Sequence, residues 1–311
     1  MAALATLGGV ASPEIKRARM KDDPPNAVVA RPPAAPPGTN TPVAINFSRD
    51  VGWAGTLALE IQRTGDSTVF NTFNDDGNPE IGVWLSPISP DSFDQVVARL
   101  HASGYERLAQ GRAVPPGTKM VSFGERLPGQ DVPTMRSFAS VPAALSPVVV
   151  ALDELRRQLR AHPSRVLRGR AAWQIGEVSR GEEATLGLML TNVGNSPLDL
   201  SNPIASRGGW SGMRLVFGRA GATGEQQRDL PAADLRPAEG TPRTPMLTLA
   251  PGQSIRFDAR MKADLPSGKY SVRVEYHSLT NPDDDAQFVG GVLSLDAGPV
   301  TVKRGAWWRL P

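Results

Sequence analysis

Side chains that could support catalysis are few and widely spaced in this sequence of 311 residues. The chain contains no Cys, which excludes disulfides, thiol chemistry and Cys-based zinc sites. Its three histidines, His101, His162 and His277, lie far apart in the sequence and offer little for acid–base or metal chemistry. Neither a nucleophile elbow nor a Walker or Rossmann glycine pattern occurs. We therefore expect no catalytic residues.

Two acidic turns are the best metal candidates. Oxygen-bearing side chains occupy alternate positions from Asn74 to Glu80, as a hard cation would require, but the twelve-residue calcium loop is not completed. A second turn concentrates three carboxylates around Asp283 and Asp285. We expect both turns to be solvated and the protein to need no cofactor. The alternative is a bound calcium ion, for which the candidate ligands are Asp76, Glu80, Asp283 and Asp285.

Exposed aromatic residues are the clearest candidates for binding. Trp307, Trp308 and Arg309 stand together near the end of the chain, and Trp210 lies in a glycine-rich segment. Aromatic side chains flanked by arginine are common anchors of protein interfaces. We expect these four residues to contact a protein partner. Alternatively, the tail folds back and covers the preceding strands.

The first 41 residues contain seven prolines and almost no aliphatic pattern, a composition typical of disordered segments. Residues 1–12 are small and apolar and resemble the end of a secretory signal, although the basic n-region is absent. The sequence predicts a Pro-rich leader over residues 1–41 and a periplasmic or secreted protein. A cytoplasmic protein with a flexible terminus is the alternative.

Residues 42–168 are predicted to form an α+β domain. Alternating apolar residues around Phe47 and Leu59 indicate half-buried strands. Ser89-Pro90 precedes an apolar stripe at helical spacing, which predicts a helix with Ser89 as its N-cap. Ser146-Pro147 predicts a second helix in the same way. Further strand-like segments lie between the helices, so we expect both helices to pack on one antiparallel sheet.

Residues 169–302 are predicted to form an all-β immunoglobulin-like sandwich. Seven short alternating segments follow one another with turn signals between them and no convincing helix. Residues 219–245 are rich in Ala, Gly, Pro and charge, and we expect them to form a long loop. Residues 303–311 are assigned to the aromatic tail.

Both segments resemble known families. The series Leu190-Thr191-Asn192, Pro251-Gly252-Gln253-Ser254 and Pro266 to Tyr270 resembles the immunoglobulin-like domains of bacterial CARDB modules and BsuPI-type proteinase inhibitors, over roughly residues 180–276. Arg49, the turn at residues 52–55 and the later Ser-Pro helix are similar to emfourin-type inhibitors of metalloproteases. These resemblances imply fold more than function, and no inhibitory residue can be transferred from them.

The charge pattern argues against nucleic acid as a partner. The pI is about 9.4, yet Lys and Arg number 34 against 31 Asp and Glu, and the two signs are evenly spread. An arginine cluster from Arg156 to Arg170 follows the second predicted helix, where the helix dipole favours cations; a patch for an acidic partner is the alternative. No run reaches the roughly 20 apolar residues of a membrane helix, so we expect no integral membrane protein.

Together these features predict a non-catalytic protein-binding protein of the bacterial envelope or secreted space, which includes an inhibitor or immunity-like factor. A structural component of an extracellular assembly is a variant of this hypothesis. The alternative from a different class is a hydrolase or carbohydrate-active enzyme that uses carboxylates such as Asp75, Asp76 or Glu80, two of which would have to face one cleft.

Overall fold

The structure is a computed structural model that describes residues 41–50, 55–74, 78–108, 119–205, 212–239, 241–278 and 287–304. The chain divides into Met1–Gly38, which lies outside the described residues, and Thr39–Pro311. No helix in its described ranges has the length and apolar character needed to cross a membrane.

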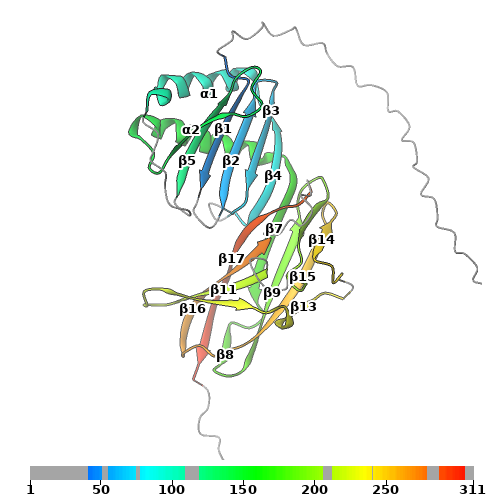
Figure 1. The fold of residues 1–311 in the computed structure, drawn as a ribbon. Helices are drawn as coiled ribbons and strands as arrows, with labels where there is room; N and C mark the ends of the chain where they lie inside the picture. Colours follow the sequence, from blue (N-terminus) through cyan, green and yellow to red (C-terminus); the bar gives the residue numbers. More distant parts are fainter. Residues whose placement is uncertain are drawn as a thin grey trace, which may run out of the picture. The chain divides into compact units, whose positions relative to one another are not determined.

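The N-terminal portion of this unit places two α-helices against strands (Figure 1). Its described elements are β1 (Ala44–Asp50), β2 (Thr56–Gln62), β3 (Asp66–Asn71), β4 (Glu80–Pro87), α1 (Pro90–Ala102), the 3₁₀ helix η2 (Tyr105–Arg107), β5 (Met120–Arg126), β6 (Thr134–Phe138), the 3₁₀ helix η3 (Ala143–Leu145), α2 (Ser146–Gln158) and the 3₁₀ helix η4 (Leu159–Ala161). Apolar residues of both helices and of the strands share one core cluster, which includes Phe47, Leu59, Phe93 and Leu152. The predicted order of strands and helices is confirmed.

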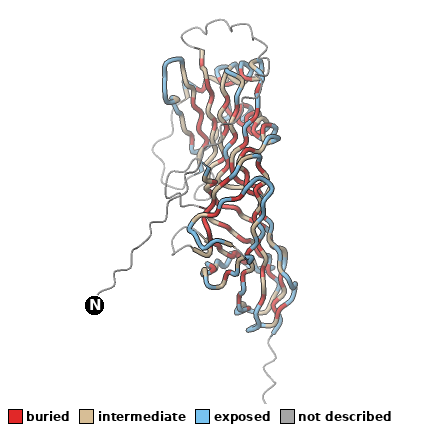
Figure 2. Tube along the Cα trace, turned by 90° about the vertical axis from the view of Figure 1, so that its right-hand side faces the viewer, coloured by how far each residue is buried: buried red, intermediate tan, exposed pale blue. Residues whose placement is uncertain are grey.

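The described C-terminal portion is formed by strands and one short 3₁₀ helix. They are β7 (Pro163–Trp173), β8 (Glu177–Ser179), β9 (Glu183–Asn192), β10 (Leu198–Ser201), β11 (Gly212–Arg219), β12 (Glu225–Leu230), η5 (Ala232–Asp234), β13 (Leu235–Pro237), β14 (Met246–Leu249), β15 (Ser254–Lys262), β16 (Gly268–Ser278) and β17 (Gly291–Lys303). A second core cluster lies among them, and buried and exposed positions alternate along many strands (Figure 2). The described part of the chain is therefore mostly β, with two α-helices.

One large antiparallel sheet runs through both portions. Its order is β13-β15-β9-β7-β4-β3-β2-β1-β5-β6. β7 joins the portions because it pairs with β4 on one side and β9 on the other. The boundary expected between residues 168 and 169 thus falls inside this strand. A second sheet, β12-β11-β16-β17-β8, is mixed because β8 runs parallel to β17, and β10 pairs separately with β14.

The two helix starts differ from each other. Ser89 caps α1 as predicted: its hydroxyl accepts a hydrogen bond from the Ser92 N–H, and Pro90 stands in the first turn. The prediction for α2 is wrong in one detail, because Leu145 and not Ser146 occupies the N-cap position and no side chain caps this end. The preceding 3₁₀ turn already leads the backbone into helical geometry, so Ser146 lies inside the helix.

The expected loop over residues 219–245 also needs correction. It contains β12, η5 and β13, and β12 pairs with β11 over six residues from Met213↔Leu230 to Gly218↔Glu225. β12 is an edge strand and five of its six residues are exposed or half-buried. Its polar sequence therefore lacks the apolar alternation by which strands are recognised.

A fully buried tyrosine is expected to make the free energy of unfolding fall as the pH rises above about 10. Tyr276 is 0% exposed, its hydroxyl donates a hydrogen bond to the Ser201 carbonyl over 2.5 Å, and burial raises the pKa of the phenol. Above about pH 10 the unfolded chain releases this proton and the folded chain keeps it, so stability falls by about 1.4 kcal/mol per pH unit. Urea unfolding between about pH 8 and pH 11 measures this slope. We expect a shallower slope for Tyr276→Phe; equal slopes in both proteins would contradict the assignment.

Candidate functional site

Most residues chosen from the sequence lie outside the described part of the chain. The aromatic set Trp210, Trp307, Trp308 and Arg309 is among them. So are the acidic candidates Asp75, Asp76, Asp283 and Asp285. Of the metal candidates, only Glu80 has a described environment.

Glu80 is surrounded by arginines. It begins β4, it is 8% exposed, and its Oε1 accepts hydrogen bonds from Nε and Nη2 of Arg168 over 2.8 and 2.5 Å. Its Oε2 lies 3.7 Å from Nη2 of Arg160, whose guanidinium also stacks 4.6 Å above the ring centre of the buried Trp84. Because cationic groups face both oxygens, this carboxylate is a poor ligand for a metal ion.

Arg156, another member of the arginine cluster, lies in α2 and has a buried side chain. Arg156 is 1% exposed, and its Nη1 donates a hydrogen bond to Asn71 Oδ1 over 3.3 Å. Its Nε lies 3.7 Å from Asp153, which also pairs with Arg49 over 2.5 Å. Arg156, Arg160 and Arg168 therefore meet internal polar groups.

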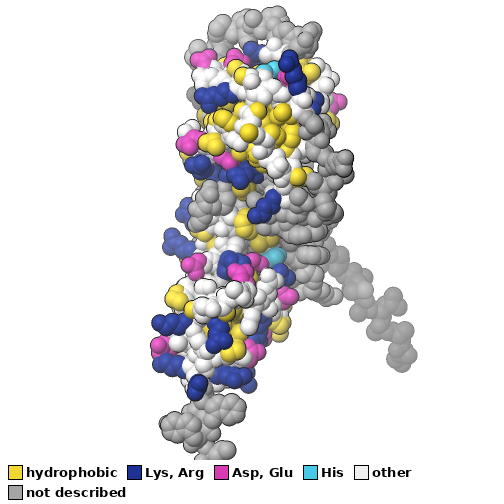
Figure 3. Space-filling view, turned by 90° about the vertical axis from the view of Figure 1, so that its left-hand side faces the viewer, with side chains coloured by type: hydrophobic (Ala, Val, Ile, Leu, Met, Phe, Trp, Pro, Cys, Tyr) yellow, Lys and Arg dark blue, Asp and Glu magenta, His cyan; other side chains and the backbone are white. Residues whose placement is uncertain are grey.

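Charged side chains of both signs are interspersed on the face shown in Figure 3, as the even distribution of charge along the sequence predicts.

In the described part of the chain, a groove of about 810 Å³ lies between β7 and β17. Its walls combine apolar side chains with several arginines. The lining residues are Asn74, Pro79, Gly169–Gln174, Gly187–Met189, Arg256, Arg273 and Ser294–Asp296. We call this the β7–β17 groove. Its volume lies in the usual range of ligand sites, roughly 300–1,000 Å³.

Strand edges line this groove on two sides. β4 pairs with β7 only as far as Glu80↔Arg168, followed by one hydrogen bond from the Gly169 N–H to the Pro79 carbonyl over 3.0 Å. Residues 170–173 of β7 have β9 as their only described strand neighbour. β17 pairs with β16 on one side. On its other side it forms an isolated bridge between Val292 and Phe73 and pairs with β8 over residues 301–303. Two partly unpaired strand edges therefore border the same hollow.

One end of the groove is fixed by Asn74. Its Nδ2 donates to the Ser294 carbonyl over 2.8 Å, and its Oδ1 accepts from the Ser294 N–H over 2.6 Å. The amide side chain thus imitates a neighbouring strand and satisfies the backbone of β17 at this point. Asn74 belongs to the first of the two candidate metal-binding turns, but its side chain is used to hold the two portions of the sheet structure together.

The side chains of the groove offer both apolar and cationic contacts. Arg170, Met189 and Arg256 stand in one row across β7, β9 and β15, and Met189 is 37% exposed. Arg256 pairs with Asp258 over 2.9 Å, whereas the side chain of Arg170 has no ion pair or hydrogen bond within the described residues. The Trp173 ring lines the wall, and its Nε1 is buried without a hydrogen-bond partner among the described groups.

Comparison with known proteins does not assign this chain to a family. No protein-family model and no curated protein matches it. Among solved structures, it is similar to the Pseudomonas fluorescens alkylpurine DNA glycosylase AlkC (10% identity, 51% of this chain and 36% of that chain, TM-score 0.27) and to the C-terminal domain of Wzt (12% identity, 45% and 74%, TM-score 0.27). It is also similar to red sea bream transglutaminase, with 12% identity and a TM-score of 0.22. That match covers 84% of this chain and 27% of the transglutaminase. Scores this low establish neither a shared fold nor a shared function.

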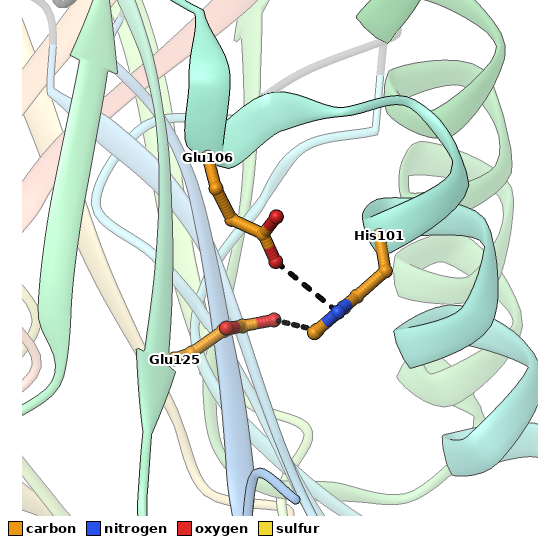
Figure 4. A group of neighbouring side chains, drawn as sticks. All are labelled: His101, Glu106 and Glu125. Atoms are coloured by element: carbon orange, nitrogen blue, oxygen red, sulfur yellow. Dashed lines mark hydrogen bonds and ion pairs between the residues drawn. The ribbon is translucent and has the colours of Figure 1, made fainter. Parts of the chain in front are cut away.

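A second cluster could hold a metal ion. His101, Glu106 and Glu125 point toward one another from α1, η2 and β5 (Figure 4). One potential ligand atom from each lies within 4.8 Å of the others. Sequence reasoning missed this cluster because Glu125 reaches His101 only through the packing of β5 beside the end of α1. The spacing of His101 and Glu106 across a helix end was the only local signal.

Proposed function

We propose that this chain is a non-catalytic binding protein that takes up an extended segment of a partner protein in the β7–β17 groove. The observation that carries the proposal is the pair of partly unpaired strand edges on the two sides of this groove. A segment added to a free edge gains main-chain hydrogen bonds, and pockets for its alternate side chains give specificity.

The length and direction of the β7 edge fit a short strand. Residues 170–173 would pair with about four partner residues, or roughly 13 Å of extended chain. The Gly169 N–H points away from β9 and the Gln174 N–H donates to Thr185 on β9, so N–H groups alternate between the two sides. The N–H of Ala171 therefore faces the groove and is available to a partner.

The groove chemistry favours a segment with one apolar and one acidic side chain. Trp173 and Met189 offer a polarisable apolar surface, and Arg170 has a guanidinium free of described partners. A bidentate pair with a carboxylate would satisfy Arg170. Asp296 is the single carboxylate among the described lining residues, which include no histidine, so the groove offers no pair for acid–base catalysis.

The immunoglobulin-like fold expected for the C-terminal portion is part of the same proposal. Core residues from β9 and β15 share one cluster with those from β11, β16 and β17, and this shared core supports the proposal that the two sheets form an immunoglobulin-like sandwich. An inhibitor or immunity-like role outside the cytoplasm is compatible with such a module, and its support is the sequence resemblance described above. The aromatic tail around Trp307 is a further candidate contact of the same partner.

Affinity capture from the native cell, followed by mass spectrometry, tests the groove if variants are compared. Arg170→Glu reverses the charge that would meet the acidic side chain, and Ala171→Pro removes the N–H that faces the groove. Proline is tolerated at open strand edges, and unfolding curves would verify that this variant folds. We expect both variants to lose a partner that the unmodified chain retains, with affinity at least about tenfold lower.

Arg260→Glu is the matched control, because Arg260 is exposed on the neighbouring strand β15 and does not line the groove. The proposal requires one protein that survives this control change and is lost with both groove variants. If all variants retain the same proteins, or if the unmodified chain retains none above a mock column, the groove is not the binding site.

A further inference from the structure

We propose that His101, Glu106 and Glu125 bind one divalent transition-metal ion of the Zn²⁺ type, with solvent at the remaining coordination positions. This site is separate from the β7–β17 groove and does not depend on the function proposed for that groove.

The three side chains are already gathered by the backbone. His101 Nδ1 lies 3.1 Å from Glu106 Oε1, and His101 Nε2 lies 2.8 Å from Glu125 Oε1 (Figure 4). Gly104, with φ +65°, reverses the chain between His101 and Glu106, and its N–H donates to the His101 carbonyl over 2.9 Å. The two carboxylates face different nitrogens of the ring, and an imidazole binds one ion through one nitrogen, so the exposed Glu106 or the ring must turn for all three groups to reach the same ion.

The charge balance of this cluster is unusual for the protein. Among the described residues, His101 is the only ion-pair partner of either Glu106 or Glu125. In contrast, Glu80 and Asp153 are compensated by guanidinium groups. Two carboxylates that share a single imidazole keep a net negative charge, and a divalent cation would neutralise it.

The more buried carboxylate is also held in place. The side chain of Glu125 is 12% exposed, and Tyr105, which is 3% exposed, hydrogen-bonds to it. The Tyr105 ring also packs against His101 at 6.3 Å between ring centres. Such outer contacts orient the ligands of metal sites.

The donor set selects the class of ion. Imidazole nitrogen suits Zn²⁺ and its neighbours in the transition series, whereas Ca²⁺ and Mg²⁺ require oxygen ligands. His101 and Glu106 are 40% and 45% exposed, so an ion can enter from solvent and would retain water. Three protein ligands with an open position are sufficient for a four-coordinate zinc ion.

Calorimetric titration of the full chain with ZnCl₂ alone measures the site. We expect saturable binding of about one equivalent, a rise in the unfolding temperature that EDTA reverses, and no such effect with CaCl₂. His101→Gln, Glu106→Gln and Glu125→Gln should each weaken Zn²⁺ binding at least about tenfold. With Co²⁺ as a substitute, absorption bands of a coordinated ion should appear and be lost in the same variants.

His277→Gln is the matched control, since His277 faces a single carboxylate, Glu275, at 3.4 Å. This variant should bind Zn²⁺ as the unmodified chain does. If Glu125→Gln fails to fold, Glu106→Gln decides, because Glu106 is largely exposed. The site is disproved if Zn²⁺ does not bind, if Ca²⁺ binds equally well, or if the folded His101 and Glu106 variants retain full affinity.

Discussion

Gly82→Ala is expected to lower the free energy of unfolding by at least about 3 kcal/mol. Gly82 lies in β4 at φ +133°, a conformation that side chains rarely adopt. An added Cβ would lie 2.1 Å from the Arg165 carbonyl oxygen and 2.9 Å from the Val166 Cα. Both are backbone atoms of β7, so relief of the clash would require the two strands to separate.

The consequence extends beyond one strand pair. Gly82 pairs with Val166 in the β4–β7 register, and this pairing continues the large sheet from one portion to the other. Urea unfolding of the variant measures the loss, and the slope reports whether the transition remains cooperative. Gly252→Ala is the control, because Gly252 has φ +75° and nothing within 4 Å of an added Cβ. It should cost only about 1–2 kcal/mol, and equal losses in the two variants would refute the steric argument.

Local chemistry predicted the elements where the signal lies within a few residues. Ser89 and Pro90 start α1 because a hydroxyl acceptor and a fixed φ act on the next turn alone. The same two residue types did not set the start of α2, since the chain before Ser146 is already wound into η3. Strands were found where one face is buried, and β12 was missed because both of its faces are largely polar or exposed.

The candidate sites could not be predicted in this way. The groove depends on where pairing between β4 and β7 stops, and on Asn74 meeting Ser294, which is 220 residues away in the sequence. The metal cluster likewise depends on the place of Glu125 beside the end of α1. Spacing in the sequence carries no record of such contacts, because strand register and helix packing determine them together.

Arg156→Met is expected to cost about 3–5 kcal/mol of unfolding free energy. The guanidinium is nearly inaccessible to solvent and serves both Asn71, which is 0% exposed, and Asp153. Methionine fills much of the same volume, but the largely buried carboxylate of Asp153 then has Arg49 as its one remaining ion-pair partner among the described residues. The Asn71 oxygen loses the hydrogen bond that Arg156 donates.

Two further variants separate this electrostatic cost from a loss of packing. Arg157→Met is the control on the same helix, because Arg157 is about half exposed and pairs with the equally exposed Glu154, and its change should be within about 0.5 kcal/mol. Adding Asp153→Leu to Arg156→Met removes the stranded charge, and Arg49 is exposed enough to regain water. The double variant should therefore be more stable than Arg156→Met alone, as measured by urea unfolding. If the double variant loses as much unfolding free energy as Arg156→Met and Asp153→Leu lose separately, added together, the network contributes through packing and not through the pairing of buried charges.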